Sequence, residues 1–488
     1  KMSAQIGMGE VKGVVVVVGC GLAGCMTAML LARRGYTVEI FERNPDWRTK
    51  FKLEGDDLHR SNIKRSINLA LSHRGRCALG RIGLEAEVLK FAVPMRGRAI
   101  HTSKNVLDPL GFQPYDAYDR KNCIYSVGRE RLNNLLLEKL EEMPNVTVRF
   151  SHGLMHVDGE GVAHFCNGTG ESLNTYNDYA KGTYQIKPRL IIGADGAYST
   201  VREAMLRLQS TNFSRRYISH GYKELTIPAD SSGGYALKNH EALHIWPRGS
   251  FMMIALPNPD KSFTATIFAP LHTEPAENNT SNIGLMDIKT RDDVKEYMST
   301  HFPDALGAMP NYQEEFLENP TSPLVMVEVT PWNIKDKMVL LGDAAHAMVP
   351  FYGQGMNSAF EDCLYLDECI DKFKGDLSLA VPHFAESRAP AGRAIAQLSL
   401  GNYLEMRHHT GSSLFLLQKK LEGALNWAFP DYWIPLYKMV TFTRIPFDKV
   451  IKREDTQANI LRRSFWLGAG ASAGIVVWAL NKLIRSSL

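Results

Sequence analysis

Several features that would assign the chain to a specialised class are missing from its sequence. The charge is nearly balanced, with 56 Lys and Arg against 52 Asp and Glu in 488 residues. This balance gives no reason to expect nucleic acid or a strongly acidic substrate as the partner. We find no internal repeat and no long low-complexity tract. A composition of 44% hydrophobic and 22% charged residues therefore indicates an ordinary globular protein with two or three domains.

Cysteine is scarce and forms no recognisable pattern. The seven cysteines are odd in number, contain no Cys-x-x-Cys pair, and several lie in apolar runs, where a thiol behaves as a small hydrophobe. This usage favours a reducing compartment over a disulfide framework, and we assign no metal site. The first apolar run, Gly13 to Val18, leads into a glycine motif instead of a cleavage site, so we expect no secretory signal there.

One uncharged run stands apart near the other end of the chain. Residues 465–480 (FWLGAGASAGIVVWAL) carry no charge and have basic residues on both sides. A membrane span normally needs about 20 apolar residues, and the neighbouring residues extend this run if polar side chains reach toward the headgroups. The pattern predicts a membrane anchor helix over 464–485. An amphipathic or buried terminal helix is the alternative.

The most informative motif lies near the start. Residues 14–43 read VVVVVGCGLAGCMTAMLLARRGYTVEIFER, which is a valine run, a GxGxxG motif, a helical pattern and a second β-rich run. In such a βαβ unit Gly19 permits the tight turn, Gly21 lets the backbone approach a pyrophosphate, and Gly24 lets the helix pack on the strand. Glu42 is placed to accept hydrogen bonds from a ribose. This motif alone leaves FAD and NAD undecided.

Two further segments have a strand followed by a polar turn. Residues 190–202 read LIIGADGAYSTVR, and residues 338–357 read MVLLGDAAHAMVPFYGQGMN. An Asp-Gly pair after a strand is usually only a turn. In the second segment, however, the Gly-Gln-Gly backbone could form an anion-binding nest, and Asp343 could hold a ribityl or ribose hydroxyl.

The order of these three motifs resembles that of the single-component FAD-dependent aromatic hydroxylases. The resemblance implies FAD and NADPH as cofactors. It places Asp343 on the ribityl chain, Met356 and Asn357 beside the isoalloxazine ring, and Asp195 in contact with both cofactors. Arg129, in YSVGRERLNN, matches the arginine that reaches the pyrophosphate, although a solvated residue at the start of a helix is the alternative. The full cofactor set expected is Gly19, Gly21, Ala23, Gly24, Phe41, Glu42, Arg43, Asn44, Ala70, Arg129, Leu154, Asp195, Asp343, Met356 and Asn357.

The expected fold is α/β: a Rossmann-like FAD-binding domain with an inserted, mostly antiparallel β-sheet substrate domain, a helical C-terminal region and a C-terminal membrane helix. No second GxGxxG unit is present, which agrees with a family that lacks a separate NADPH domain. Strand-like runs between the second and third motifs predict the inserted sheet. The expected domain boundaries are 11–205 and 331–378 for FAD binding, 206–330 for the substrate domain, 379–450 for the helical region and 464–485 for the anchor.

Within this family the resemblance is densest to the hydroxylases of L-kynurenine, in segments such as RSINLALSHRGR, HGYKELTIP, LHIWPRGSFMMIALPN and NYLEMRHH. It implies that Arg98 and Tyr115 bind the substrate carboxylate and that Asn402 and Tyr437 complete the polar contacts. The remaining expected pocket residues are Glu405, Met406, Leu243, Ile254, Phe268 and Phe351.

Three of these assignments carry alternatives. Arg98 could be an ordinary surface charge. Leu243, Ile254 and Phe268 alternate on strands and could be ordinary core residues. The loop from Gly111 to Asn122 departs from the family pattern, because Asp116 replaces a usual glycine, so Tyr118 is a rival to Tyr115.

The reaction implied is hydroxylation of L-kynurenine to 3-hydroxykynurenine with NADPH and O₂, through a flavin hydroperoxide, in tryptophan catabolism. We assign no catalytic side chain, because histidines such as His73 and His346 beside a cofactor are more often structural. The tail resembles an anchor in the outer mitochondrial membrane, with the catalytic domain facing the cytosol. The alternatives are another aromatic or lipid substrate, as in a ubiquinone-pathway hydroxylase or an epoxidase, or a non-catalytic flavin-binding membrane scaffold. The oligomeric state stays open.

Overall fold

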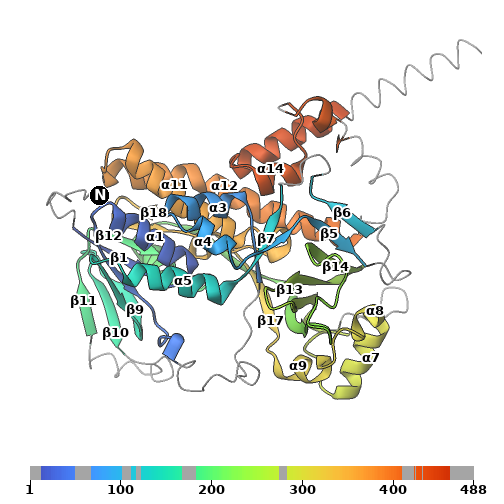
Figure 1. The fold of residues 1–488 in the computed structure, drawn as a ribbon. Helices are drawn as coiled ribbons and strands as arrows, with labels where there is room; N and C mark the ends of the chain where they lie inside the picture. Colours follow the sequence, from blue (N-terminus) through green and yellow to red (C-terminus); the bar gives the residue numbers. More distant parts are fainter. Residues whose placement is uncertain are drawn as a thin grey trace, which may run out of the picture.

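The computed structural model describes residues 13–49, 68–101, 111–116, 122–167, 183–273, 283–408, 422–423, 425–430 and 432–461, with the side chains of 183 and 404–408 excepted. The chain folds around two large sheets (Figure 1). The segment expected to anchor the protein, 464–485, lies outside the described residues. Among the described helices none is long and apolar enough to cross a membrane.

A six-stranded sheet carries the three glycine-containing motifs. Its order is β18 (Asn333–Ile334), β19 (Met338–Leu340), β12 (Leu190–Gly193), β1 (Val14–Val18), β2 (Thr37–Phe41) and β8 (Val146–Arg149), and all pairs except β18–β19 are parallel. The strands are apolar and mostly buried, as strands covered on both faces must be. Since β1, β12 and β19 are neighbours, the loops at their carboxyl ends meet at one edge.

Helices cover the faces of this sheet. They are α1 (Leu22–Arg33), α3 (His73–Arg81), α5 (Arg129–Glu141), α6 (Thr200–Leu208), α11 (Gly355–Lys372) and α12 (Leu377–His408). A small sheet of β9 (His152–Val157), β10 (Ala163–Asn167) and β11 (Thr183–Ile186) packs its Phe165 on Phe41, with ring centroids 3.8 Å apart. A third sheet joins β3 (Asn68–Leu71), β7 (Ile124–Gly128) and β4 (Val93–Met95), and α4 (Glu85–Leu89) precedes β4.

A seven-stranded sheet forms the second layer. Its order is β17 (Ser322–Thr330), β13 (Asn212–Ile227), β16 (Phe263–Pro270), β15 (Phe251–Pro257), β14 (Ala242–Arg248), β5 (Gly97–Ile100) and β6 (Phe112–Pro114). It is antiparallel except where β14 pairs with β5. β5 and β6 come from the first segment of the chain, so the edge of the inserted sheet is completed by residues from the 11–205 region.

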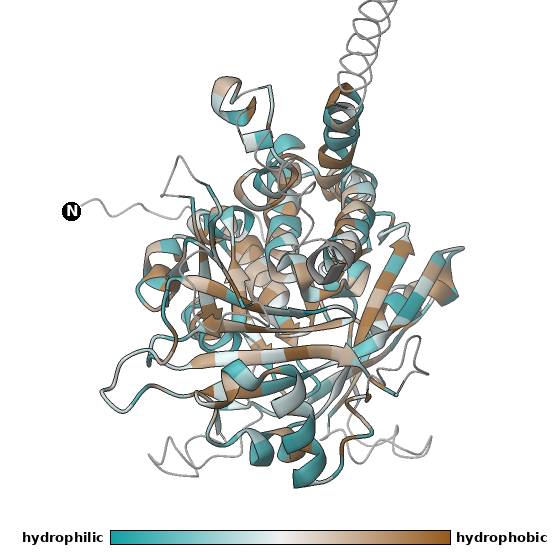
Figure 2. Ribbon diagram, turned by 90° about the vertical axis from the view of Figure 1, so that its right-hand side faces the viewer, coloured by the Kyte–Doolittle hydropathy of each residue, from teal (hydrophilic) through white to brown (hydrophobic). Residues whose placement is uncertain are grey.

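The two faces of this sheet have different partners. One face packs on α7 (Arg291–His301), α8 (Pro303–Leu306) and α9 (Tyr312–Glu318), which lie beneath it in Figure 1. The other face turns toward the six-stranded sheet and α14 (Leu436–Phe442). Figure 2 shows hydrophobic residues concentrated on the central strands and mixed with hydrophilic residues on the helices around them.

A buried histidine pair lies near the outer strands of this sheet. His101 Nε2 and His244 Nδ1 are 2.9 Å apart, and His101 stacks on Trp246 at 3.9 Å between ring centroids. Burial lowers the pKa of His101 to about 4 and that of His244 to about 3, although Asp304 partly opposes the shift at His101. Because protonation is disfavoured in the folded state, both residues destabilise the fold as the pH falls below 6.5.

We therefore expect His101→Phe, which keeps the stacking ring, to become more stable relative to the parent protein as the pH falls from 7 to about 4.5. The expected gain at the acidic end is on the order of 1–3 kcal/mol, from a shift of this size discounted for the remaining histidine. Thermal unfolding of both proteins across this pH range measures it. A stability difference that does not change with pH would contradict the assignment.

Candidate active site

A cavity of about 300 Å³ lies where the two large sheets face each other. Residues from all three motifs line it, together with the inner face of the seven-stranded sheet and α14. Its lining includes these predicted site residues: Gly21, Ala23, Ala70, Arg129, Asp343 and Met356 from the cofactor set, and Arg98, Leu243, Ile254, Phe268, Phe351 and Tyr437 from the substrate set. Residues that are far apart in the sequence thus meet at one site.

The first glycine motif leaves an open approach to the start of α1. Gly19 adopts φ 98°, where a side chain would also collide with the backbone of Ala194 and Asp195. At Gly21 a Cβ would meet nothing within 4 Å, so the loop is open on the cavity side. α1 begins with no side-chain cap and no acidic residue in its first turn. Its free N–H groups fit the negative charge of a pyrophosphate, and Arg129, the exposed first residue of α5, lines the same cavity.

Glu42 closes the glycine loop at the end of β2. Its Oε2 accepts a hydrogen bond from the Cys20 backbone N–H at 3.0 Å, and its Oε1 accepts from the Asn44 N–H at 2.9 Å. Oε1 also accepts from Asn44 Nδ2 at 2.7 Å, so Oε2 is the oxygen that retains a further lone pair for a ribose hydroxyl. Arg43 and Asn44 are exposed beside it, whereas Phe41 and Leu154 are buried in the adjacent core.

Asp343 is held at the start of α10 (Asp343–His346) with its carboxylate exposed toward the cavity. The preceding Gly342 has φ 56° and packs against Ala359 and Ala23, so a side chain there would be strained. A carboxylate with free lone pairs in this position fits the hydroxyl groups of a ribityl chain.

Asn357 and Asp195 do structural work that the sequence did not reveal. The Asn357 side chain accepts from the Ser72 N–H at 2.8 Å and donates to the carbonyls of Ala70 at 2.7 Å and Gly353 at 2.8 Å. It joins β3 to the Gly-Gln-Gly loop and is fully buried. Asp195 Oδ2 accepts from Thr200 N at the start of α6 at 2.7 Å. Asp195 Oδ1 is buried without a partner among the described residues, which leaves it available to a cofactor.

Arg98 dominates the other end of the cavity. Its guanidinium carbon lies 4.5 Å from the ring centroid of Tyr437 and 5.8 Å from that of Tyr115, and the two rings stack at 5.1 Å. No carboxylate of the described residues forms an ion pair with Arg98, and its Nε and the Tyr115 hydroxyl are buried without hydrogen-bond partners there. A cation that lies beside stacked aromatic rings and lines a cavity fits a carboxylate on the ligand.

The cavity wall between these two ends is mainly apolar. Leu243, Ile254 and Phe268 share the inner face of the seven-stranded sheet, which explains why the alternation of their strands resembled that of core residues. Thr266 and Met252 line the same wall and were missed, although Thr266 stands two positions before Phe268 on β16. Because side chains two positions apart on a strand point to the same face of the sheet, the sequence could have identified Thr266.

The helical C-terminal residues are placed only in part. Asn402 lies on α12, is 8% exposed, and its Nδ2 donates to the Phe351 carbonyl at 2.8 Å. It therefore supports the wall through Phe351. The side chains of Glu405 and Met406, and residue 118, lie outside the described part of the chain, so their expected roles stay predictions.

A half-buried carboxyl group faces this side of the sheet. Glu224 on β13 pairs in register with Thr266 on β16. Burial raises the pKa of Glu224 to about 7, against an opposing effect from Arg129. Glu224 is therefore a carboxyl group, partly protonated near neutral pH, that stands next to the cavity-lining Thr266 without itself lining the cavity.

Behind the loop that carries Asp343, three segments meet in a buried ion cluster: residues 342–346, α11 and α12. Asp362 Oδ2 accepts from the Gly342 backbone N–H at 3.1 Å and lies 2.6 Å from His346 Nε2. Arg388 Nη2 donates to Asp362 Oδ1 at 2.6 Å. Burial alone would raise the pKa of Asp362, but the charges of His346 and Arg388 outweigh it and hold that pKa below its usual value.

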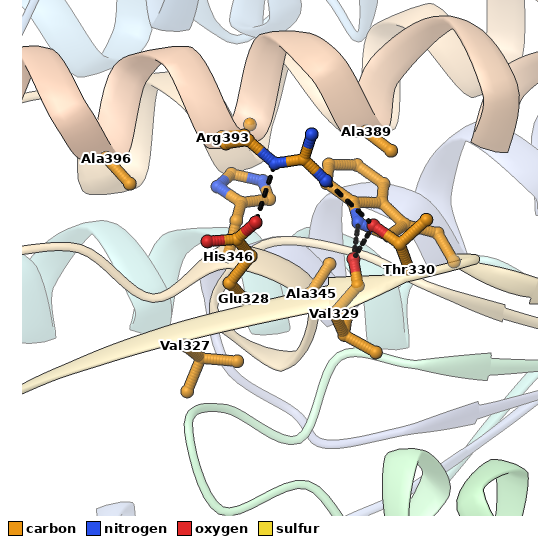
Figure 3. Close-up of a pocket in the computed structure, with 11 residues that line it drawn as sticks. Val327, Glu328, Val329, Thr330, Ala345, His346, Ala389, Arg393 and Ala396 are labelled. Carbon is orange, nitrogen blue, oxygen red and sulfur yellow. Dashed lines mark hydrogen bonds and ion pairs between the residues drawn. The ribbon is translucent and has the colours of Figure 1, made fainter. Parts of the chain in front are cut away.

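His346 faces away from the cavity. It stacks on Trp332 at 5.0 Å and borders a hollow of about 10 Å³ between α12 and β17, near Arg393 and Glu328 (Figure 3). His346 is not among the residues that line the large cavity. Its place beside Asp362 indicates a role in holding the loop.

The chain is similar to known proteins over most of its length. Residues 12–373 match the family model described as FAD binding domain. Over 465 residues the chain is 39% identical to a kynurenine 3-monooxygenase of Anopheles gambiae, covering 95% of this chain and 88% of that one. It is 39% identical over 477 residues to that of Sus scrofa (97% and 93% covered) and 38% identical over 449 residues to that of Legionella pneumophila strain Corby (92% and 92% covered). The chain belongs to the kynurenine 3-monooxygenase family.

Solved structures show the same fold at lower identity. A tetrameric form of 2-methyl-3-hydroxypyridine-5-carboxylic acid oxygenase matches with TM-score 0.60 and 17% identity, covering 84% of this chain and 96% of that one. PqsL of P. aeruginosa, in a complex with 2-aminobenzoylacetate, matches with TM-score 0.61 and 19% identity, covering 81% and 97%. These likenesses confirm the FAD-dependent monooxygenase fold that the three motifs predicted.

The buried cluster gives a prediction about the cofactor site. Asp362→Asn leaves Arg388 without its main counter-charge, and we expect the FAD-free protein to lose about 3–5 kcal/mol of unfolding free energy. We also expect FAD to bind at least about tenfold more weakly, since the single amide oxygen of Asn cannot accept from both Arg388 and the Gly342 N–H next to Asp343. Denaturant unfolding and quenching of flavin fluorescence measure the two effects.

Asp371→Asn is the matched control, because Asp371 lies on the same helix and pairs with Arg34 and Arg81 but is 54% exposed. Its expected cost is below about 1 kcal/mol, with FAD affinity unchanged. Equal effects of the two substitutions would show that the burial of Asp362 is unimportant.

Proposed function

We infer that the protein hydroxylates L-kynurenine to 3-hydroxykynurenine with NADPH and O₂, using FAD as its cofactor. The observation that carries this conclusion is Arg98, which lies beside two stacked tyrosine rings and forms no ion pair with a carboxylate of the described residues, at the end of a cavity that begins at the FAD motifs. Membership of the kynurenine 3-monooxygenase family supports the same substrate, since the relatives bear that name.

The side chains of the chain bind and orient the substrate. The guanidinium of Arg98 would receive the carboxylate of the amino acid, and Tyr437 lies beside it. The aniline ring would then lie against Leu243, Ile254 and Phe268, directed toward the cofactor end. The redox chemistry would come from bound FAD, which NADPH can reduce and which can then activate oxygen. The apolar wall limits the water near the reacting ring.

The alternative functions fit this arrangement less well. A lipid or quinone substrate has no carboxylate to balance Arg98, so the guanidinium would remain buried without a counter-charge. A flavin-binding scaffold without turnover gives no reason for a cavity that joins the cofactor loops to such a cation. Both alternatives also conflict with the names of the relatives.

We further propose that the uncharged run at 465–480 anchors the protein in the outer mitochondrial membrane, with the catalytic domain in the cytosol. Support comes from the sequence alone: sixteen uncharged residues with basic residues on either side. Cell fractionation of the full chain and of a chain ending at 461 tests this proposal, and an unchanged membrane fraction after truncation would refute it.

The first test of the function is NADPH consumption by the FAD-loaded protein with and without L-kynurenine, with 3-hydroxykynurenine measured by chromatography. We expect L-kynurenine to stimulate NADPH oxidation and to yield product. If no stimulation occurs, the substrate assignment is wrong while the FAD-binding fold remains.

The role of Arg98 is tested with a substrate that lacks the carboxylate. Arg98→Met should lower kcat/KM for L-kynurenine by roughly a hundredfold or more, as expected for loss of a buried charge-assisted contact. For kynuramine, the decarboxylated analogue, the parent protein and the variant should be similar. Arg96→Met, which removes an arginine 42% exposed and paired with Glu241, is the control and should leave both substrates unaffected. A loss of the same size for both substrates would argue against carboxylate recognition by Arg98.

A further inference from the structure

The short segment from Gly111 to Asp116 lies next to the substrate end of the cavity, where Tyr115 contacts Arg98 and Tyr437, which line it. Its strand β6 pairs with β5, and the Tyr115 N–H donates to the Arg96 carbonyl at 3.0 Å. This pairing is the outermost in the seven-stranded sheet, so the segment has a neighbouring strand on only one side. An edge of this kind is easily displaced unless other contacts hold it.

α14 forms the other side and is also short, with seven residues from Leu436 to Phe442. It carries Tyr437, whose ring stacks on Tyr115 at 5.1 Å and lies 4.5 Å from the Arg98 guanidinium carbon. The aromatic surroundings of the Arg98 guanidinium therefore depend on two short segments that are far apart in sequence.

An ion pair joins these two segments one residue further along each. Lys438 Nζ lies 2.9 Å from Asp116 Oδ2, and Asn122 Nδ2 donates to the same oxygen at 2.9 Å. The Asp116 side chain is only 6% exposed, and that of Lys438 is 29% exposed. Lys438 also donates to Asn426 Oδ1 at 3.4 Å. Two consecutive residues of each segment thus meet: Tyr115 stacks on Tyr437, and Asp116 pairs with Lys438.

This ion pair differs physically from a surface salt bridge. An exposed pair contributes little because water screens it, whereas a carboxylate buried to this extent needs its counter-charge. Removing either partner leaves a poorly solvated charge, and the segments would separate to let water reach it. Asp116 occupies the position where the resemblance in sequence expected a glycine, which has no side chain to make such a contact.

We propose that the Asp116–Lys438 pair is a clasp that holds the β6 segment on α14 and so keeps the stacked rings of Tyr115 and Tyr437 beside Arg98 in readiness for the substrate carboxylate. Both are positioning residues, because they act through the two tyrosines. The proposal rests on the function inferred above and adds a determinant of substrate affinity.

A double-mutant cycle tests the clasp in the FAD-loaded full chain. Asp116→Asn and Lys438→Met should each raise KM for L-kynurenine by roughly tenfold, with kcat changed less than about threefold, because they disturb binding and not the reacting atoms. The double variant should be no worse than either single variant, since the second change removes a partner that is already lost. The affinity for FAD should remain that of the parent protein.

Lys449→Met is the matched control. Lys449 is an exposed lysine eleven positions further along whose ion-pair partner among the described residues is its neighbour Asp448. It should leave KM unchanged. If the Asp116 and Lys438 effects multiply in the double variant, or if the variants lose thermal stability with KM unaltered, the pair has no positioning role and the proposal is overturned.

A second measurement needs no turnover, so it separates failure of the clasp from failure of the proposed function. In the FAD-loaded protein without substrate, Asp116→Asn should accelerate amide hydrogen exchange at least tenfold in the 111–116 and 436–442 peptides, while β15 stays protected. If the parent protein does not act on L-kynurenine but this change occurs, the substrate is wrong and the clasp stands. Unchanged exchange in both peptides overturns the clasp whatever the substrate is.

Discussion

The arrangement of the active site depends on one buried group of charges on α11. Two consecutive residues of this helix, Glu361 and Asp362, are almost fully buried and pair with Arg74 and Arg388, which are 0% and 4% exposed. Charges that are removed from water to this degree are tolerated only when every one has a partner in good geometry. α3, α11 and α12 therefore have little freedom to move relative to one another.

This cluster extends to both ends of the cavity. Toward the cofactor, Asp362 binds the Gly342 N–H next to Asp343. Toward the substrate, Arg74 donates to the carbonyls of Val440 at 3.2 Å and Ile445 at 2.6 Å, in and just after the helix that carries Tyr437. Arg74 follows Ser72, whose N–H is bound by Asn357. Both ends are thus attached to the same buried cluster, which relates the position of the cofactor loop to that of the helix that carries Tyr437.

The sequence was most informative where function imposes a local pattern. Gly19, Gly21 and Glu42 lie within one βαβ unit, and the Asp195 and Asp343 motifs each follow a strand, so the parallel sheet could be predicted to bring them together. The apolar walls were also accessible from strand period. Contacts between distant segments were not: Arg74 pairs with Glu361 287 positions away, and neither residue belongs to a motif. The inclusion of β5 and β6 in the inserted sheet was missed for the same reason, because strand pairing has no local signature.

The two ends of the cavity differ in the number of backbone contacts that hold them, and this difference matches the different ligands that they bind. The cofactor end is made by loops between long buried strands and helices, and its carboxylates and glycines are fixed by backbone contacts. The substrate end is made by an edge strand and a seven-residue helix, whose polar groups face each other and Arg98. Segments with few backbone partners open at lower free energy than core strands. The substrate must enter and leave at every turnover, which the easily opened edge strand and short helix allow. The cofactor stays bound, which the loops between buried strands and helices favour. Arg98 lies at the substrate end on β5, paired with Leu243 of β14, so it belongs to the sheet and stays in place while the tyrosines beside it can separate.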